Sequence, residues 1–181
     1  MKSRNKKSCI FYVVRHAQSK SNIGHFFHAN PCLTSKGEDQ AKKLGTVLKD
    51  VPFDAVFSSD LHRAKHTAKI IIQKRNLVLQ THKSLRERRS VDLLIEKFYR
   101  GTLNNAVTPF ILTLREIAKE YSGKKVLVVS HGFIMRSFLV SIKFATFNDL
   151  PFGSIDNTGF FKLSSDGVNF SVLETVGVNK R

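Results

Sequence analysis

The chain has 181 residues, of which 41% are hydrophobic and 24% charged, and its 30 Lys and Arg residues against 14 Asp and Glu residues give a net charge of +16. This length is typical of one domain, and the composition excludes a fibrous or low-complexity protein. Two cysteines cannot build a disulfide framework and have no metal spacing, while no apolar stretch is long enough to span a membrane. We therefore expect a cytoplasmic protein in a reducing compartment, with no membrane partner.

The positive charge favours anionic partners, which include small phosphorylated substrates, phosphoproteins and nucleic acid. A host-wide bias in composition gives the same excess of Lys and Arg, so both explanations stay open. The interleaving of basic and aromatic residues that is typical of single-strand binders is absent, which makes nucleic acid the less favoured partner. Residues 1–8 are basic and are predicted to form a flexible tail, so residues 9–181 form the single predicted domain.

Residues 10–14 are β-branched, aromatic and apolar, a pattern typical of a buried strand. Arg15 and His16 follow at once, so this strand delivers them to the carboxyl edge of a sheet, where open α/β sheets bind ligands. A guanidinium can hold a phosphoryl group by two hydrogen bonds while a neutral imidazole nitrogen attacks the phosphorus. An Arg-His pair is also common on protein surfaces, so the pair alone is weak evidence.

A loop, a helix and a second strand are predicted next. The loop covers residues 23–33, the helix begins with a capping box over residues 35–38, and the strand covers residues 53–58. Ser59 is a candidate cap for the following helix, whose first turn contains Arg63. Because a helix N-terminus favours anions, we expect Arg63 to bring a second cation to the same sheet edge.

Residues 77–80 are a candidate third strand, and Glu87 follows it among arginines. Taken alone, such a glutamate is most simply a partner in surface ion pairs, which are worth ~0–1 kcal/mol. A short helix is predicted over residues 92–100. A longer helix is predicted to begin with Thr108 as its cap and Pro109 at its first position.

Residues 125–130 are the clearest strand of the sequence, and they lead into His131, Gly132 and another helix. This repeats the arrangement of the first strand, and Gly132 lets backbone amides approach a ligand. A hairpin at the sheet edge is predicted over residues 157–175. The pattern predicts an α/β protein, a three-layer α/β/α sandwich with a mostly parallel central sheet and an antiparallel edge strand.

Two histidine pairs remain, and neither has a third metal ligand nearby in the sequence. They are His25 with His28 and His62 with His66. Neither a metal nor a cofactor is therefore expected.

Five segments in chain order resemble those of the histidine phosphatase superfamily, which includes the phosphoglycerate mutases: residues 15–22, 33–41, 58–68, 85–87 and 129–132. The resemblance runs from residue 10 to about residue 163 and implies a phosphoglycerate mutase-like fold. It implies a metal-independent phosphatase in which His16 forms a phosphohistidine and Glu87 is the general acid and base. It also implies that the phosphoryl oxygens are held by Arg15, Asn22, Arg63, His131 and Gly132.

The sequence departs from the family pattern at three places. Ala17 replaces the usual glycine after the first histidine, residues 88–91 replace a glycine and an aromatic-Glu-Gly segment, and the interval from Glu87 to His131 is short. A mutase needs an extensive cover that keeps water out, so the short interval favours hydrolysis. A protein phosphohistidine phosphatase, a phosphoglycerate mutase-type phosphotransferase and a polyanion-binding protein with a vestigial site remain as alternatives.

Overall fold

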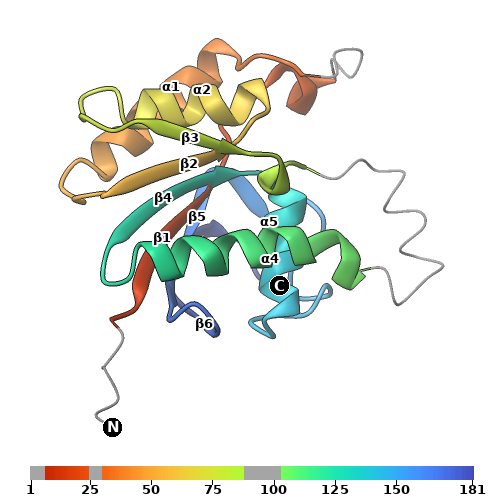
Figure 1. Ribbon diagram of the computed structural model, residues 1–181. Coiled ribbons are helices and arrows are strands. Elements are labelled where there is room, and N and C mark those ends of the chain that lie inside the picture. The colour runs from red at the N-terminus through yellow and green to blue at the C-terminus, as the bar shows by residue number, and fades with distance from the viewer. Residues whose placement is uncertain (1–6, 25–29, 88–102) are drawn as a thin grey trace, which may run out of the picture.

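The strands of the protein are β1 (Cys9–Arg15), β2 (Ala55–Ser59), β3 (Leu79–His82), β4 (Lys125–Ser130), β5 (Ile155–Ser165) and β6 (Phe170–Val178). They form one sheet in the order β3-β2-β4-β1-β5-β6, shown in the computed structural model of Figure 1. The first four strands of this order are parallel, whereas β5 runs antiparallel to β1 and forms a hairpin with β6 at the edge. The mostly parallel sheet with an antiparallel edge is confirmed.

The structure describes residues 7–24, 30–87 and 103–181. The predicted helix over residues 92–100, the pair His25 and His28, and residues 1–6 of the predicted tail lie outside these ranges. Lys7, near the end of the predicted tail, accepts a hydrogen bond from the Ser122 hydroxyl at 2.7 Å.

Helices cover both faces of the sheet. The α-helices are α1 (Ser35–Val47), α2 (His62–Ile71), α4 (Leu103–Glu120) and α5 (Gly132–Ser141), and two 3₁₀ turns are η1 (Lys20–Ile23) and η2 (Lys83–Leu85). Figure 1 shows α1 and α2 together on one face, with α4 and α5 on the other. The predicted three-layer sandwich is therefore confirmed.

Successive residues of the central strands point alternately to the two faces of the sheet, and a hydrophobic core lies on each face. The core beneath α4 and α5 contains Phe11, Val13, Val126, Val128, Phe110 and Phe138. The core beneath α1 and α2 contains Tyr12, Val14, Leu127, Val129, Leu44 and Ala68. Burial on both faces explains why β1 and β4 are continuous apolar runs in the sequence.

Three helix starts differ from the sequence prediction. The N-cap of α2 is Leu61, whose amide donates to the Ser59 hydroxyl at 3.2 Å, and not Ser59 itself. The cap of α1 is Thr34 and not Ser35, because the Thr34 hydroxyl accepts a hydrogen bond from the Gly37 amide at 3.0 Å. Helix α4 begins at Leu103, and Pro109 lies inside it. A proline removes its own amide donor and crowds the carbonyl four residues earlier, but it leaves the hydrogen bonds of the preceding amides intact.

Within the described ranges, no helix combines the length and apolar character needed to cross a bilayer. The same residues contain no cluster of three or more His, Cys, Asp or Glu side chains suited to a metal ion. Cys9 and Cys32 are both free thiols.

Candidate active site

The two central parallel strands deliver two histidines to one edge of the sheet. Arg15 pairs with Ser130 at the ends of β1 and β4, and the His16 amide donates to the Ser130 carbonyl at 2.9 Å. The His16 and His131 rings lie 5.0 Å apart between centroids. Both side chains are buried, with exposed fractions of 3% and 0%. The structure thus brings together two residues that are 115 positions apart in the chain.

The hydrogen bonds of His16 define which ring nitrogen is free. Its Nδ1 lies 2.8 Å from the Ala17 carbonyl oxygen, which can only accept, so Nδ1 carries the proton. The other nitrogen, Nε2, accepts a hydrogen bond from Arg63 Nε at 3.1 Å. Burial, together with the charge of Arg63, lowers the pKa of His16 to about 3. The imidazole is therefore neutral at physiological pH, which is the nucleophilic form.

His131 shares this environment. Burial, followed by the neighbouring His16, lowers the pKa of His131 well below its ordinary value. Both of its ring nitrogens are buried, and neither has a hydrogen-bond partner among the described residues. A buried polar atom without a partner is costly, so an incoming phosphoryl oxygen would find an available donor here.

Arg15 and Arg63 place two guanidinium groups beside the histidines. Burial lowers the pKa of both, although a guanidinium remains protonated at neutral pH. Arg15 donates to the Ile155 carbonyl, and its buried Nε has no partner among the described residues. An added Cβ at Gly132 would lie 3.1 Å from Arg15 Nε. Gly132 therefore leaves room for the guanidinium.

Glu87 lies half-buried at the N-terminus of α5. It accepts hydrogen bonds from the Phe133 amide and from the Ile134 amide, the latter at 3.3 Å. Burial raises the pKa of Glu87 above its ordinary value, against the opposing effects of Arg63 and of these amides. A raised pKa favours the protonated carboxyl group, which can donate a proton to a leaving group.

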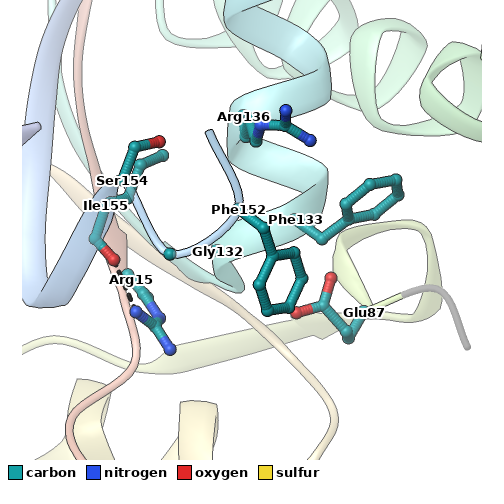
Figure 2. Close-up of a pocket in the computed structure, with 9 residues that line it drawn as sticks. Arg15, Glu87, Gly132, Phe133, Arg136, Phe152, Ser154 and Ile155 are labelled. Carbon is teal, nitrogen blue, oxygen red and sulfur yellow. Dashed lines mark hydrogen bonds between the residues drawn. The ribbon is translucent and has the colours of Figure 1, made fainter. Parts of the chain in front are cut away.

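A pocket of about 70 Å³ opens on the Glu87 side of this arrangement. Figure 2 shows the side chains that line it: Arg15, Glu87, Phe133, Arg136, Phe152, Ser154 and Ile155, with Gly132 and Gly153 completing the wall. The lining does not include His16 or Arg63. The pocket therefore lies beside the histidine pair and not over it.

Three side chains hold the backbone of residues 16–18. Asn157 Nδ2 donates to the His16 carbonyl at 3.0 Å, and Thr67 Oγ1 accepts from the Ala17 amide at 3.0 Å. Gln40 Oε1 accepts from the Gln18 amide at 2.9 Å. Asn157 was not predicted as a site residue, and neither were Thr67 and Gln40, although the latter two lie within segments that resemble the family, residues 58–68 and 33–41.

The segment over residues 33–41 supports the same loop by close packing. An added Cβ at Gly37 would lie 2.0 Å from the Gln18 carbonyl oxygen, far inside any allowed contact. The Thr34 hydroxyl donates to Gln18 Oε1 at 2.9 Å. Helix α1 therefore packs its first turn directly on the loop that follows the first histidine.

Asn22 and the pair of His62 and His66, also singled out from the sequence, make local contacts. Asn22 Oδ1 accepts from the Ser19 amide and hydroxyl, both at 2.9 Å, and so stabilises the turn η1. The role of Asn22 in phosphate binding stays a prediction. His62 and His66 lie on α2 with ring centroids 5.8 Å apart.

The fold and the site define an α/β protein with a neutral, buried histidine and two guanidinium groups at the carboxyl edge of its sheet. The chain belongs to the histidine phosphatase superfamily (branch 1), whose sequence profile matches residues 11–93 and 110–176.

Three known proteins illustrate the similarity. An adenosylcobalamin/alpha-ribazole phosphatase of Salmonella typhimurium is 41% identical over 68 residues, which are 36% of this chain and 34% of that protein. The chain thus spans about a third of the length of the first curated relatives it matches. The uncharacterized phosphatase PhoE of Bacillus subtilis is 29% identical over 145 residues, or 72% of this chain and 75% of that protein. The crystal structure of a phosphoglycerate mutase from Bacillus anthracis superposes with a TM-score of 0.78 at 24% identity, covering 96% of this chain and 94% of the other, and shows the shared fold.

Proposed function

We propose that this protein is a metal-independent phosphatase that hydrolyses phosphomonoesters through a phosphohistidine on His16. The observation that carries the proposal is the neutral, buried His16 ring, whose Nδ1 proton is held by a carbonyl while Nε2 faces Arg63. Two guanidinium groups next to this nitrogen would supply the positive charge that Mg²⁺ supplies in other phosphoryl-transfer enzymes.

In the first step, Nε2 of His16 attacks phosphorus and the bond from phosphorus to the ester oxygen breaks. The Glu87 carboxyl group gives its proton to the departing alkoxide, which leaves as an alcohol. Arg15, Arg63 and His131 hold the phosphoryl oxygens as negative charge builds on them, and the Gly132 region and Asn22 add hydrogen bonds.

In the second step, water attacks the phosphorus of phospho-His16. The Glu87 carboxylate takes a proton from this water, the bond from phosphorus to nitrogen breaks, and inorganic phosphate leaves. His16 returns to its neutral form. The acid of the first step is thus the base of the second.

Hydrolysis is favoured over transfer to a second acceptor because a mutase must exclude water while its intermediate turns over in the site. The short interval between Glu87 and His131 leaves little chain to build such a cover. The sequence relatives include phosphatases and also 2,3-bisphosphoglycerate-dependent phosphoglycerate mutases, which supports the chemistry at this coarser level. A protein phosphohistidine could use the same steps as a small ester.

The test is to trap the intermediate. Wild-type protein turning over a ³²P-labelled phosphomonoester should yield a protein-bound label that is stable in alkali and labile in acid. His16→Ala should lose both the label and the turnover, while His62→Ala, a change at an exposed histidine on α2, should keep both. Wild-type turnover without a label, or full activity in His16→Ala, would contradict the proposal.

The partition between hydrolysis and transfer needs a second assay. Wild-type protein given 3-phosphoglycerate should release phosphate faster than it forms the 2-phospho isomer. Isomerisation that exceeds phosphate release would identify a mutase-type phosphotransferase instead.

The net charge of +16 favours a second candidate function, the binding of a polyanion such as RNA. Because binding to phosphates releases counterions, affinity should then fall steeply with salt. Weak RNA binding at low ionic strength, together with phosphatase turnover, would eliminate this candidate.

A further inference from the structure

The geometry points to a role for the pocket beside Glu87: we infer that it is a subsite for the leaving group and selects phosphomonoesters of alcohols that carry an aromatic ring. This inference rests on the proposed phosphatase function and specifies its substrate class.

The position of the pocket follows from the roles of the two charged residues in its wall. Arg15 would hold a phosphoryl oxygen, and Glu87 would protonate the ester oxygen, so the group bonded to that oxygen lies on the Glu87 side. Both residues line the pocket, whereas His16 does not. A leaving group attached to a phosphoryl group on His16 therefore extends into this space.

Aromatic and apolar side chains form much of the wall. Phe133 and Ile155 are buried behind it, while Phe152 is 81% exposed on the turn before β5. Figure 2 shows the Phe152 ring directed toward the Glu87 carboxyl group. The next residue, Gly153, has a φ of +84°, a conformation that glycine adopts readily. A flat apolar group in the pocket would cover the exposed Phe152 ring, and such ring pairs prefer offset or edge-to-face contact.

Besides Arg15 and Glu87, which act on the phosphoester itself, the wall has two polar side chains, Ser154 and Arg136. Ser154 is 5% exposed, and its Oγ is buried with no partner among the described residues, so it is available to one hydrogen-bonding group of a ligand. The Arg136 guanidinium already donates to the carbonyls of Leu150 and Phe147 and stacks on the Phe147 ring at 4.4 Å. These bonds use Nε and Nη2 and hold Arg136 against its own loop. Apart from Arg15, Glu87 and Arg136, the wall offers a ring surface and one hydroxyl, which suits an aromatic alcohol better than a sugar with several hydroxyls.

The test compares benzyl phosphate with ethyl phosphate, since both are primary alkyl esters whose alcohols have similar acidity and only one carries a ring. Wild-type protein should have a kcat/KM for benzyl phosphate about ten-fold or more above that for ethyl phosphate. Phe152→Ala should lower the benzyl value about ten-fold, the scale of one aromatic contact, and leave the ethyl value within about two-fold. Phe152→Tyr should retain the preference. Val78→Ala is the matched control, because Val78 is 84% exposed and does not line the pocket.

Two results would overturn the inference while leaving the proposed phosphatase intact. One is equal kcat/KM for the two esters in the wild type, with labelling of His16 by both. The other is a parallel loss for both esters in Phe152→Ala. If the wild type releases phosphate from neither ester and His16 takes no label from any phosphomonoester, the inference and the proposed function both fail.

Discussion

Replacing Gly37 with alanine should damage both the stability of the protein and its site. The added Cβ would lie 2.0 Å from the Gln18 carbonyl oxygen, a backbone atom that no side-chain rotation can move away. Helix and loop must therefore separate by at least about 1 Å, and overpacking of this kind costs ~1–3 kcal/mol. Alanine gains about 1 kcal/mol over glycine within a helix, which offsets only part of that cost. We expect the free energy of unfolding to fall by up to about 2 kcal/mol.

The control lies on the same helix. A Cβ at Gly45 would meet its nearest neighbour, the Ile71 Cα, at 3.4 Å, an ordinary contact, so Gly45→Ala should be neutral or stabilising by up to about 1 kcal/mol. Urea unfolding of both variants measures the difference. Because the loop of Gln18 follows His16, Gly37→Ala should also lower kcat by about 10²-fold, the scale of a 1 Å misplacement. Equal stability of the two variants would refute the packing argument.

Three further predictions concern the site. Thr67→Val removes the acceptor of the Ala17 amide and should lower the free energy of unfolding by about 1–3 kcal/mol in urea titrations, whereas Thr67→Ser should stay near wild type. Glu87→Gln should lower kcat/KM, which reports formation of the phosphohistidine, about 10²-fold or more for ethyl phosphate but much less for p-nitrophenyl phosphate, because nitrophenolate leaves without a proton; an equal loss of kcat/KM would argue against Glu87 as the acid of the first step. The pKa of His16 is about 3 in the folded protein, below the ordinary value of 6.5 that applies to the unfolded chain. As the pH drops, the unfolded chain therefore binds the proton first. The free energy of unfolding should fall between pH 6.5 and pH 3. His16→Asn should flatten this fall between pH 7 and pH 5, and an unchanged slope would contradict the low pKa.

The position of the two histidines was predictable because each follows an uninterrupted apolar run. A buried parallel strand has an unambiguous pattern, and its carboxyl end fixes where the next residue lies. Arg63 was predictable because it lies in the first turn of the helix that follows β2. The predicted cap at Ser35 was wrong because Thr34, beside it, carries an equally suitable hydroxyl, and only the three-dimensional course of the chain chooses between them.

The supporting contacts were not predictable because they join segments that only the complete fold brings together. The Asn157 side chain reaches the His16 carbonyl across 141 positions of sequence. The adjoining Thr158 has a φ of 63°, and the pairing of β5 with β6 shifts register between Ile155 and Phe160. A hairpin pattern predicts the strands but not this irregularity, which sets the direction of the Asn157 side chain.

The pairing of β1 with β4 limits how this protein can change in length. The two strands are matched residue for residue from Ile10 with Lys125 to Arg15 with Ser130, so the spacing of His16 and His131 is set by the backbone ladder. Deleting one residue from either strand would draw its end back by about 3.3 Å and turn the histidine to the opposite face of the sheet. Insertions in the loops between elements leave the ladder unchanged. Length variation among proteins that retain this site should therefore be found in the loops and be absent from these two strands.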